Sequence, residues 1–430
     1  MKNSKKKNSN KQNTDKQNAK TIFIQIASYR DPELIPTLKD CIANAKYPEN
    51  LRFGICWQHG PEESLDEYIN DSRFKIIDIP YMESKGACWA RHLIQQKYND
   101  ETYTMQLDSH HRFIKNWDEE CINMLGELQK DGFKKPLLTG YISSYNPKND
   151  PAERVDIPWK MNFDRFIPEG AVFFLPASID DYKERTKPLR ARFYSAHFAF
   201  TLGQFCKEVP HDPDYYFHGE EISIAVRAFT NGYDLFHPHK IIAWHEYTRA
   251  GRTKQWDDVK DWGKHNDQCH AKNRKLFGMD GEERATDFGV YGFGTERTLE
   301  DYEKYAGMSF KNRSVQQFTL DHKEPPNPVY GTQKEYEESF LRVFKHCIDI
   351  GFHQVPEKDY DFWVVAFHDK SDNTLFRKDA DSGEIAHMLI DPDGYCKVWR
   401  DFQVAEKPAY WVVWPYSKSK GWCERITGNL

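Results

Sequence analysis

An apolar run leads directly into two potential metal ligands in the stretch Tyr103-Thr104-Met105-Gln106-Leu107-Asp108-Ser109-His110. The first five residues predict a buried strand, which ends where the polar residues begin. Side chains alternate along an extended segment, so Asp108 and His110 project from the same face. One carboxylate oxygen beside one imidazole nitrogen can hold a divalent cation. The alternative is that the acid and the histidines of this segment, including His111, merely end a strand in solvent.

Three earlier apolar runs, at 22–26, 51–58 and 74–79, each predict a further strand. After the first run, Pro32 opens a pattern with apolar residues at helical spacing. Strands that alternate with helices predict an open α/β sheet for this part of the chain. Ligands of such sheets bind beyond the carboxyl ends of the strands, which is where Asp108 also lies.

Two arginines near predicted strand and helix ends are candidates for contact with a phosphate. Arg30 follows the first strand together with Ser28, although an ion pair with Asp31 would also explain it. Arg91 lies about one turn into a helix predicted to begin at Gly86, and the free N–H groups of a helix start attract phosphate. The alternative for Arg91 is a side chain that faces solvent.

The middle of the chain predicts a helix at 117–129 and a strand at 136–142. A proline-rich stretch follows at 143–190, and we expect it to be irregular. Long irregular segments in compact domains often line a substrate site. The next segment, 193–200, is strand-like and contains His197.

A pair of acids begins another predicted helix, because Glu220 and Glu221 precede apolar residues at helical spacing. The helix dipole alone favours acids at this end. That explanation accounts well for one acid, but less well for a pair preceded by His218 and Gly219.

His245 ends the last predicted strand of this part, at 240–244. It either packs beside the preceding tryptophan or reaches the same cleft as Asp108 and His110. One oxygen and two nitrogen donors suit a transition metal better than Mg²⁺, and Mn²⁺ is the first choice. The segment that starts at His245 resembles the zinc-protease motif HExxH, but Arg249 stands where the second histidine is required.

Composition excludes several classes of protein. The 430 residues allow two domains, and an aromatic content of 15% supports a sizeable core. The net charge of -6 conceals a basic start, because residues 1–20 hold seven lysines and one aspartate. The acidic remainder argues against a nucleic-acid partner. We expect residues 1–20 to form a disordered basic tail, not a signal peptide.

The cysteines indicate a reducing compartment. Nine cysteines occur without CxxC pairs, which predicts free thiols and a cytoplasmic protein. No apolar run is long enough for a membrane span. The sequence also lacks the motifs GxxxxGK[ST], GxGxxG at a helix start and GxSxG.

The pattern changes near residue 324, where prolines cluster. We divide the folded chain into a catalytic domain at 21–323, a linker at 324–357 with a helical pattern over 334–350, and a small β-rich module at 358–430. Short aromatic strands are predicted in the module at 362–367, 386–390, 395–399 and 410–414. Its tryptophans could form its core or stack on sugar rings, and roles in acceptor recognition and in a homodimer are both open.

Several segments taken together resemble the nucleotide-sugar transferases of the GT-A fold. They are, in order, 26–31, 85–91, 107–110, 196–200, 219–221 and 291–302. The chain resembles most the UDP-GlcNAc:polypeptide α-N-acetylglucosaminyltransferases of glycosyltransferase family 60. Its Asp-x-His motif is similar to that of the polypeptide N-acetylgalactosaminyltransferases. The resemblance covers roughly residues 21–310, and it implies a GT-A catalytic domain followed by a small all-β module.

The resemblance also implies roles for individual residues. It places Glu220 beside the donor sugar and the acceptor hydroxyl, and Glu221 where some relatives carry an amide, and both are the predicted catalytic residues. Relatives usually carry glycines at the positions of His197 and Phe198, so a different UDP-sugar remains open. The metal ligands would be Asp108, His110 and His245, and the UDP-sugar contacts Ser28, Arg30, Arg91, Asp108, Ser109, His197, Arg249 and Arg252.

The activity implied is transfer of N-acetylglucosamine from UDP-GlcNAc, with retention, to a hydroxyl of hydroxyproline, serine or threonine. Mn²⁺, or else Mg²⁺ or another divalent cation, would assist the departure of UDP. Either a β-phosphate oxygen accepts the acceptor proton, or Glu220 acts as a nucleophile. Two alternatives are a glycan or small-molecule acceptor and a non-catalytic protein that binds sugars or nucleotides.

Overall fold

The computed structural model describes residues 20–249, 251–390 and 394–430. The expected basic tail, residues 1–20, lies outside the described residues except for Lys20. The chain divides into two compact units. The first runs to Gly307 and includes His322–Asn327, and the second contains Met308–Asp321 and Pro328–Leu430.

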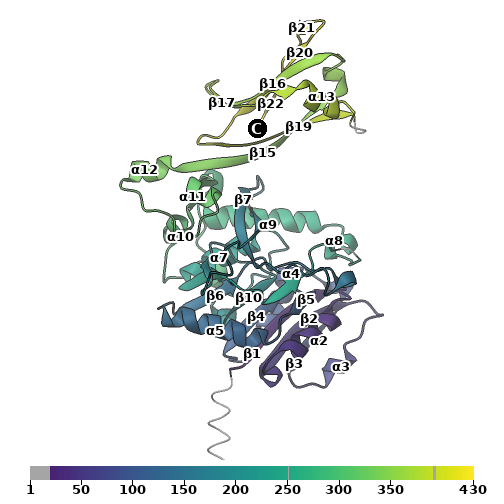
Figure 1. Cartoon of the computed structure of the whole chain (residues 1–430), viewed down its shortest axis with the longest axis vertical. Coiled ribbons are helices and arrows are strands. Elements are labelled where there is room, and N and C mark those ends of the chain that lie inside the picture. The colour runs from purple at the N-terminus through teal and green to yellow at the C-terminus, as the bar shows by residue number, and fades with distance from the viewer. Residues whose placement is uncertain (1–19, 250, 391–393) are drawn as a thin grey trace, which may run out of the picture. The chain divides into compact units, whose positions relative to one another are not determined.

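The first unit is built on an eight-stranded sheet with the order β3-β2-β1-β4-β10-β6-β11-β9. Strands β1, β2, β3 and β4 are parallel, as expected, and lie side by side (Figure 1). Strand β10 runs antiparallel between β4 and β6. The bounds are β1 Ile22–Tyr29, β2 Leu51–His59, β3 Phe74–Pro80, β4 Tyr103–Leu107, β6 Lys135–Thr139, β9 Leu189–Arg190, β10 Phe198–Leu202 and β11 Tyr233–His237.

Helices cover both faces of this sheet, which explains why its central strands are rich in apolar side chains on both faces. Ile24 and Ile26 of β1 share one core with α2 (Leu34–Asn44) and α5 (Trp117–Lys130). Phe23 points to the other face, where it packs with Ala90 and Ile94 of α4 (Ala87–Gln95). The mixed α/β fold class of the predicted GT-A domain is therefore confirmed.

The proline-rich stretch 143–190 is more regular than expected. It contains an antiparallel hairpin of β7 (Trp159–Phe166) and β8 (Val172–Ser178). Pro176 lies within β8, and a two-stranded hairpin tolerates a proline because its outer edge needs no N–H donor. The prediction of a loop-rich stretch did not include this hairpin, because the prolines concealed its pairing.

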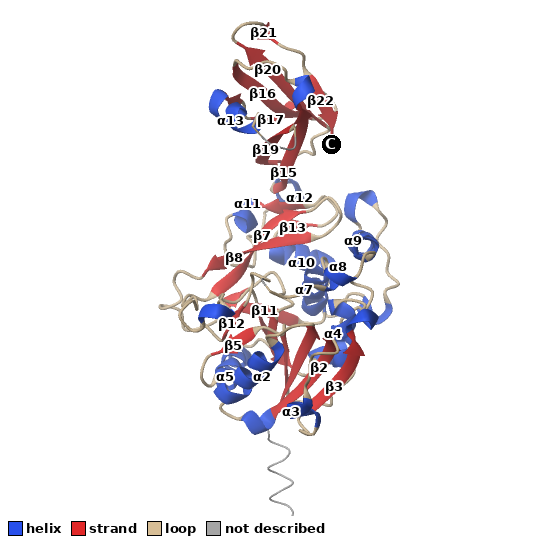
Figure 2. Ribbon diagram, turned by 90° about the vertical axis from the view of Figure 1, so that its right-hand side faces the viewer, coloured by secondary structure: helices blue, strands red, loops and turns tan. Residues whose placement is uncertain are grey.

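The second unit consists mainly of strands in two sheets (Figure 2). Trp363 and Phe367 of one sheet share a core with Val398 and Phe402 of the other. One sheet has the order β13-β14-β15-β19, and the other is built around β16 and β20. The bounds are β13 Met308–Ser309, β14 Ser314–Gln316, β15 Phe340–Gly351, β16 Tyr360–His368, β17 Thr374–Arg377, β18 Ala380–Asp381, β19 Tyr395–Val404, β20 Tyr410–Ser417, β21 Gly421–Trp422 and β22 Ile426–Asn429.

Two predicted elements of this unit were wrong. The helix expected over 334–350 ends early, because only α12 (Gln333–Glu338) is helical and β15 then pairs with β19 along its length. The strand expected at 386–390 is instead part of helix α13 (Ser382–Met388). The carboxylate of Asp381 caps that helix by accepting the N–H groups of Gly383 and Glu384.

The tryptophans of the second unit divide between core and surface. Trp363 is fully buried, whereas Trp399, Trp414 and Trp422 are 63%, 36% and 48% exposed. All nine cysteines of the chain are free thiols, as expected. Among the described residues, no helix has both the length and the apolar character that crossing a membrane requires.

The return of the chain at His322–Asn327 fixes a buried arginine of the first unit. Arg192 donates hydrogen bonds to the carbonyl oxygens of Ala306 and Lys323, at 2.9 and 2.6 Å, and to Oδ1 of Asn327 at 2.6 Å. Only 7% of Arg192 is exposed, and burial lowers the pKa of its guanidinium to about 10. Its charge is therefore stabilised by groups from two separate segments, one at Ala306 and the other the return at His322–Asn327.

We expect Arg192→Ala to lower the free energy of unfolding by about 2–4 kcal/mol, because it leaves three acceptors, two of them buried, without this donor. Urea denaturation of the full chain measures the change. Arg284→Ala is the control, since the Arg284 side chain is 42% exposed and its loss should cost less than about 0.5 kcal/mol. Equal losses for the two variants would contradict the structural role of Arg192.

Candidate active site

The candidate site forms where β1 and β4 end at the same edge of the sheet. The parallel register pairs Ile26 with Leu107, so the residues that follow the two strands emerge side by side. A two-stranded ladder brings a third segment to the site, because β5 (His111–Phe113) pairs with β12 (Ala243–His245). In that ladder His245 lies opposite His111, next to the Asp108 motif.

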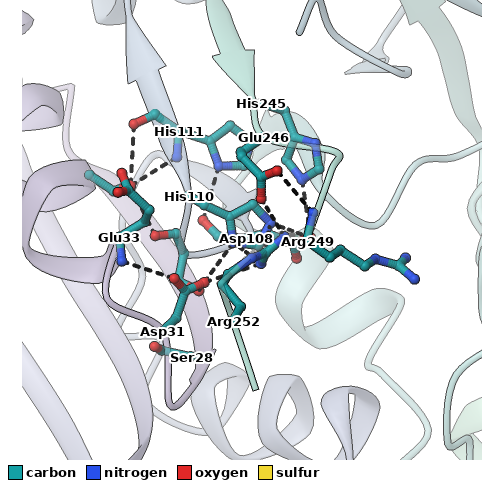
Figure 3. A network of polar contacts seen from close by, with 12 residues as sticks. Ser28, Asp31, Glu33, Asp108, His110, His111, His245, Glu246, Arg249 and Arg252 are labelled. Carbon is teal, nitrogen blue, oxygen red and sulfur yellow. Dashed lines mark hydrogen bonds and ion pairs between the residues drawn. The ribbon is translucent and has the colours of Figure 1, made fainter. Parts of the chain in front are cut away.

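The three predicted metal ligands come together. One ligand atom from each of Asp108, His110 and His245 lies within 4.8 Å of the other two. Oδ2 of Asp108 is 3.5 Å from Nε2 of His245 and 3.8 Å from Nε2 of His110 (Figure 3). His245 is buried, and within the described chain neither of its ring nitrogens has a hydrogen-bond partner. A buried imidazole of this kind fits a metal ligand, and the donor set suits Mn²⁺.

The protonation states of these groups suit metal binding. Burial lowers the pKa of His245 well below its usual value, so its imidazole is neutral at pH 7. Burial opposes ionisation of Asp108, but contact with His245 and the charges of Arg91 and His110 lower its pKa well below the usual range. The cluster therefore offers a carboxylate and a neutral imidazole, the forms that bind cations.

Asp31 orients His110. Its Oδ2 lies 2.7 Å from Nδ1 of His110 and accepts a hydrogen bond of 2.7 Å from Ser109 Oγ. A carboxylate on one ring nitrogen fixes the imidazole and leaves the other nitrogen for the metal. The sequence presented Asp31 only as a partner for Arg30, and this role was missed because it depends on the β1–β4 pairing.

Arg91 links the metal cluster to the acidic pair. Its Nη2 donates to Oδ1 of Asp108 at 2.9 Å, and its Nη1 is 3.6 Å from Oε1 of Glu220. The arginine is 6% exposed, so the solvent-facing alternative was wrong. Its helix α4 begins after Gly86, whose φ of 104° few other residues adopt.

Glu220 and Glu221 open α7 (Glu220–Thr230) and face a common space. Burial raises the pKa of Glu220. Burial, followed by repulsion from Glu220, raises the pKa of Glu221. Oε1 of Glu221 accepts the N–H of Ala196 at 2.9 Å. The two carboxyls therefore resist double ionisation near neutral pH.

Two cavities meet at this site and share Arg91, Asp108, His245 and Arg249. The first, of about 200 Å³, extends toward Tyr29, Asp31, Gln58, Ser84, Arg252 and Lys254. The second, of about 520 Å³, contains the acidic pair and is walled by Tyr141, Phe173, Phe174, His197, Phe217, Trp256 and Trp262.

The other residues predicted to contact the UDP-sugar do not all line the first cavity. Ser109, Arg249 and Arg252 line the first cavity, whereas Ser28 and Arg30 are not among its lining residues. Arg30 pairs with Asp258 at 3.1 Å instead of with its neighbour Asp31.

His197 lines the second cavity but is held by protein groups. Its Nδ1 lies 3.0 Å from Ser195 Oγ, and Tyr247 Oη lies 3.2 Å from its Nε2. The His197 ring stacks on His245 with centroids 4.3 Å apart. His197 thus supports His245, one of the predicted metal ligands, and its contact with the donor sugar stays a prediction.

Glu246 is a further residue that the sequence did not single out. Its Oε1 accepts the backbone N–H of Arg249 at 2.9 Å, and its Oε2 is 2.7 Å from Nη2 of Arg252. It thereby holds the segment that contains both arginines against the site (Figure 3). The one signal was its position directly after His245, which sequence reasoning used only to reject a zinc protease.

The mixed sheet, with Asp108, His110 and His245 at its edge, fits the GT-A transferase fold that the sequence predicts. A family model described as glycosyltransferase (GlcNAc) matches residues 21–70 and 59–312, together more than half of the chain. The chain belongs to this glycosyltransferase family. No curated protein sequence matches it.

Three solved structures show distant similarity. GalNAc-T7 with UDP, GalNAc and Mn²⁺ is 16% identical over 67% of this chain, with a TM-score of 0.44, and this chain covers 55% of its length. S. aureus TarS 1-349 with UDP-GlcNAc is 12% identical over 59% of this chain and 72% of its own, with a TM-score of 0.36. Mannosyltransferase PcManGT from Pyrobaculum calidifontis, with GDP-Man and Mn²⁺, is 11% identical over 54% of this chain and 58% of its own, with a TM-score of 0.35.

We expect His245→Ala to weaken Mn²⁺ binding at least about tenfold, because it removes one of three ligands. Isothermal titration calorimetry with UDP present measures the affinity. His239→Ala is the matched control, since His239 is also a buried histidine without a hydrogen-bond partner in the described chain but lies outside the cluster. Equal Mn²⁺ affinities for the two variants would exclude His245 as a ligand.

Proposed function

We propose that the protein is a metal-dependent, retaining transferase that moves N-acetylglucosamine from UDP-GlcNAc to a hydroxyl of a polypeptide. The observation that carries the proposal is the cluster of Asp108, His110 and His245 at the junction of two cavities. A sugar-binding protein without catalytic activity has no need for such a cluster. Family membership supports the donor, and the resemblance to polypeptide transferases supports the acceptor.

The first cavity would hold the nucleotide. Arg249 and Arg252 line it and supply positive charge for a diphosphate. Asp108, His110 and His245 would hold the metal between the two cavities, where a bound ion supplies Lewis-acid stabilisation of the leaving UDP. Aromatic side chains close the space around the arginines, because Arg249 lies 5.6 Å from the Phe217 ring and 5.5 Å from the Trp256 ring.

The second cavity would hold the donor sugar and the acceptor. Glu220 lies beside Arg91, whose charge favours the ionised form of its carboxylate, and it lines the cavity that would hold the reacting carbon. There it would stabilise positive charge that develops on the sugar ring. The wide aromatic wall, which includes Phe173 and Trp262, offers apolar surface to an acceptor side chain while water is excluded.

We expect Mn²⁺ to stimulate release of UDP from UDP-GlcNAc at least about tenfold, since the metal stabilises the leaving group. The test compares UDP-GlcNAc, UDP-GalNAc and UDP-glucose with Mn²⁺ and with a chelator, and a peptide panel with serine, threonine or hydroxyproline then serves as acceptor. An α-linked product determined by NMR supports retention. Absence of metal-stimulated UDP release from every donor would refute the proposal, and activity on glycans alone would refute the polypeptide acceptor.

The raised pKa of Glu220 predicts the acid limb of the pH profile. Activity should fall as the pH drops through this pKa of about 7, because the protonated acid no longer stabilises positive charge. Burial and repulsion from Glu220 raise the pKa of Glu221 still higher, so Glu221 is still protonated when Glu220 ionises. Glu221→Gln, which keeps an oxygen for the N–H of Ala196, should therefore leave the acid limb of kcat/KM in place. A shift of that limb to lower pH by about one unit would contradict this order of ionisation.

A further inference from the structure

Arg252 lies against the imidazole of His110, one of the three predicted metal ligands. Its Nη1 lies 2.6 Å from Nδ1 and 3.0 Å from Nε2 of His110. The same Nη1 is 3.3 Å from Oδ2 of Asp31, and Nη2 is 2.7 Å from Oε2 of Glu246. The arginine side chain is only 13% exposed. Its charge is therefore paired with Asp31 and Glu246 beside the metal cluster and is largely shielded from solvent.

A divalent cation bound to Nε2 of His110 would lie close to this guanidinium, because Nη1 of Arg252 is 3.0 Å from the same nitrogen. The nitrogen that would bind the metal is Nε2, because Asp31 engages Nδ1. A guanidinium keeps its charge in proteins, so Arg252 cannot yield by losing a proton. At about 3 Å, two cations in a buried site repel each other strongly. The side chain of Arg252 must therefore move when the metal binds.

The surrounding segment allows this side chain to move while its backbone stays attached. On one side of Arg252, the backbone N–H of Arg249 is held by Glu246. On the other side, Asp258 accepts a hydrogen bond of 2.7 Å from Tyr29 Oη and pairs with Arg30. Arg252 also lines the first cavity, so a diphosphate bound there offers it a new anionic partner.

We propose that Arg252 is an internal counter-cation of the metal site, which the metal displaces and the diphosphate of the nucleotide then binds. This inference rests on the proposed function, because it assumes the same metal and nucleotide sites. Moving Arg252 without a new partner costs free energy, so metal alone binds weakly. When the diphosphate accepts the guanidinium, that cost disappears. Metal and nucleotide therefore bind with positive cooperativity, which is reciprocal by linkage.

The test measures Mn²⁺ affinity calorimetrically, with and without UDP, for the full wild-type chain and for Arg252→Gln. Without UDP, we expect the variant to bind Mn²⁺ about tenfold more tightly than wild type, because no cation has to be displaced. With UDP, the gain should vanish or reverse, because the variant lacks the cation that contacts the diphosphate. The factor by which UDP tightens Mn²⁺ binding should thus fall at least about tenfold.

Two further variants separate this role from general effects. Lys260→Gln removes one positive charge from an exposed position just beyond the same segment, and it should leave both affinities at wild-type values. Arg252→Lys keeps the charge and should stay close to wild type without UDP. Circular dichroism confirms that each variant is folded.

The outcomes are distinguishable from failure of the proposed function. If Arg252→Gln binds Mn²⁺ without UDP no more tightly than Lys260→Gln, the counter-cation role of Arg252 is refuted while the metal site stands. If Arg252→Lys binds Mn²⁺ as tightly as Arg252→Gln, the positive charge at this position is not what weakens Mn²⁺ binding, and the inference is refuted. If the wild-type chain binds no Mn²⁺ with or without UDP, the metal site fails and both proposals fall together.

Discussion

The ionised carboxylate of Asp108 is the interaction centre on which the site depends. Arg91 approaches it from α4, His110 from its own strand end and His245 from β12. A buried carboxylate without partners would take up a proton, and each of these neighbours opposes that. Through these contacts the carboxylate of Asp108 connects the first α/β half of the sheet with the later β5–β12 ladder.

Local sequence patterns were enough to predict most of the sheet and the identity of the clustered residues. The strand that ends in Asp108 and the helix that starts at Glu220 have clear periodicity over their whole length. Ligands bind beyond the carboxyl ends of parallel strands. A polar residue at the end of a predicted strand is therefore expected to line the binding cleft. His245 could be added because it also ends an apolar run.

The partners of the charged side chains could not be predicted in the same way. Asp31 is adjacent to Arg30 in the sequence, yet it turns to His110, and Arg30 pairs with Asp258 more than two hundred residues away. These pairings form between segments that are far apart in the sequence and meet only in the folded chain. β15 was missed for a related reason, since its apolar residues suit a helix locally and the pairing with distant β19 decides the outcome.

The return of the chain at His322–Asn327 has a consequence for how this architecture could arise or be divided. The second unit begins at Met308, but a later segment comes back to the first unit and accepts hydrogen bonds from Arg192. No single cut therefore separates two complete units. A gene that exchanged its 3′ part at the first boundary would lose part of the catalytic fold as well, so recombination that replaces the β-rich unit must preserve this short segment.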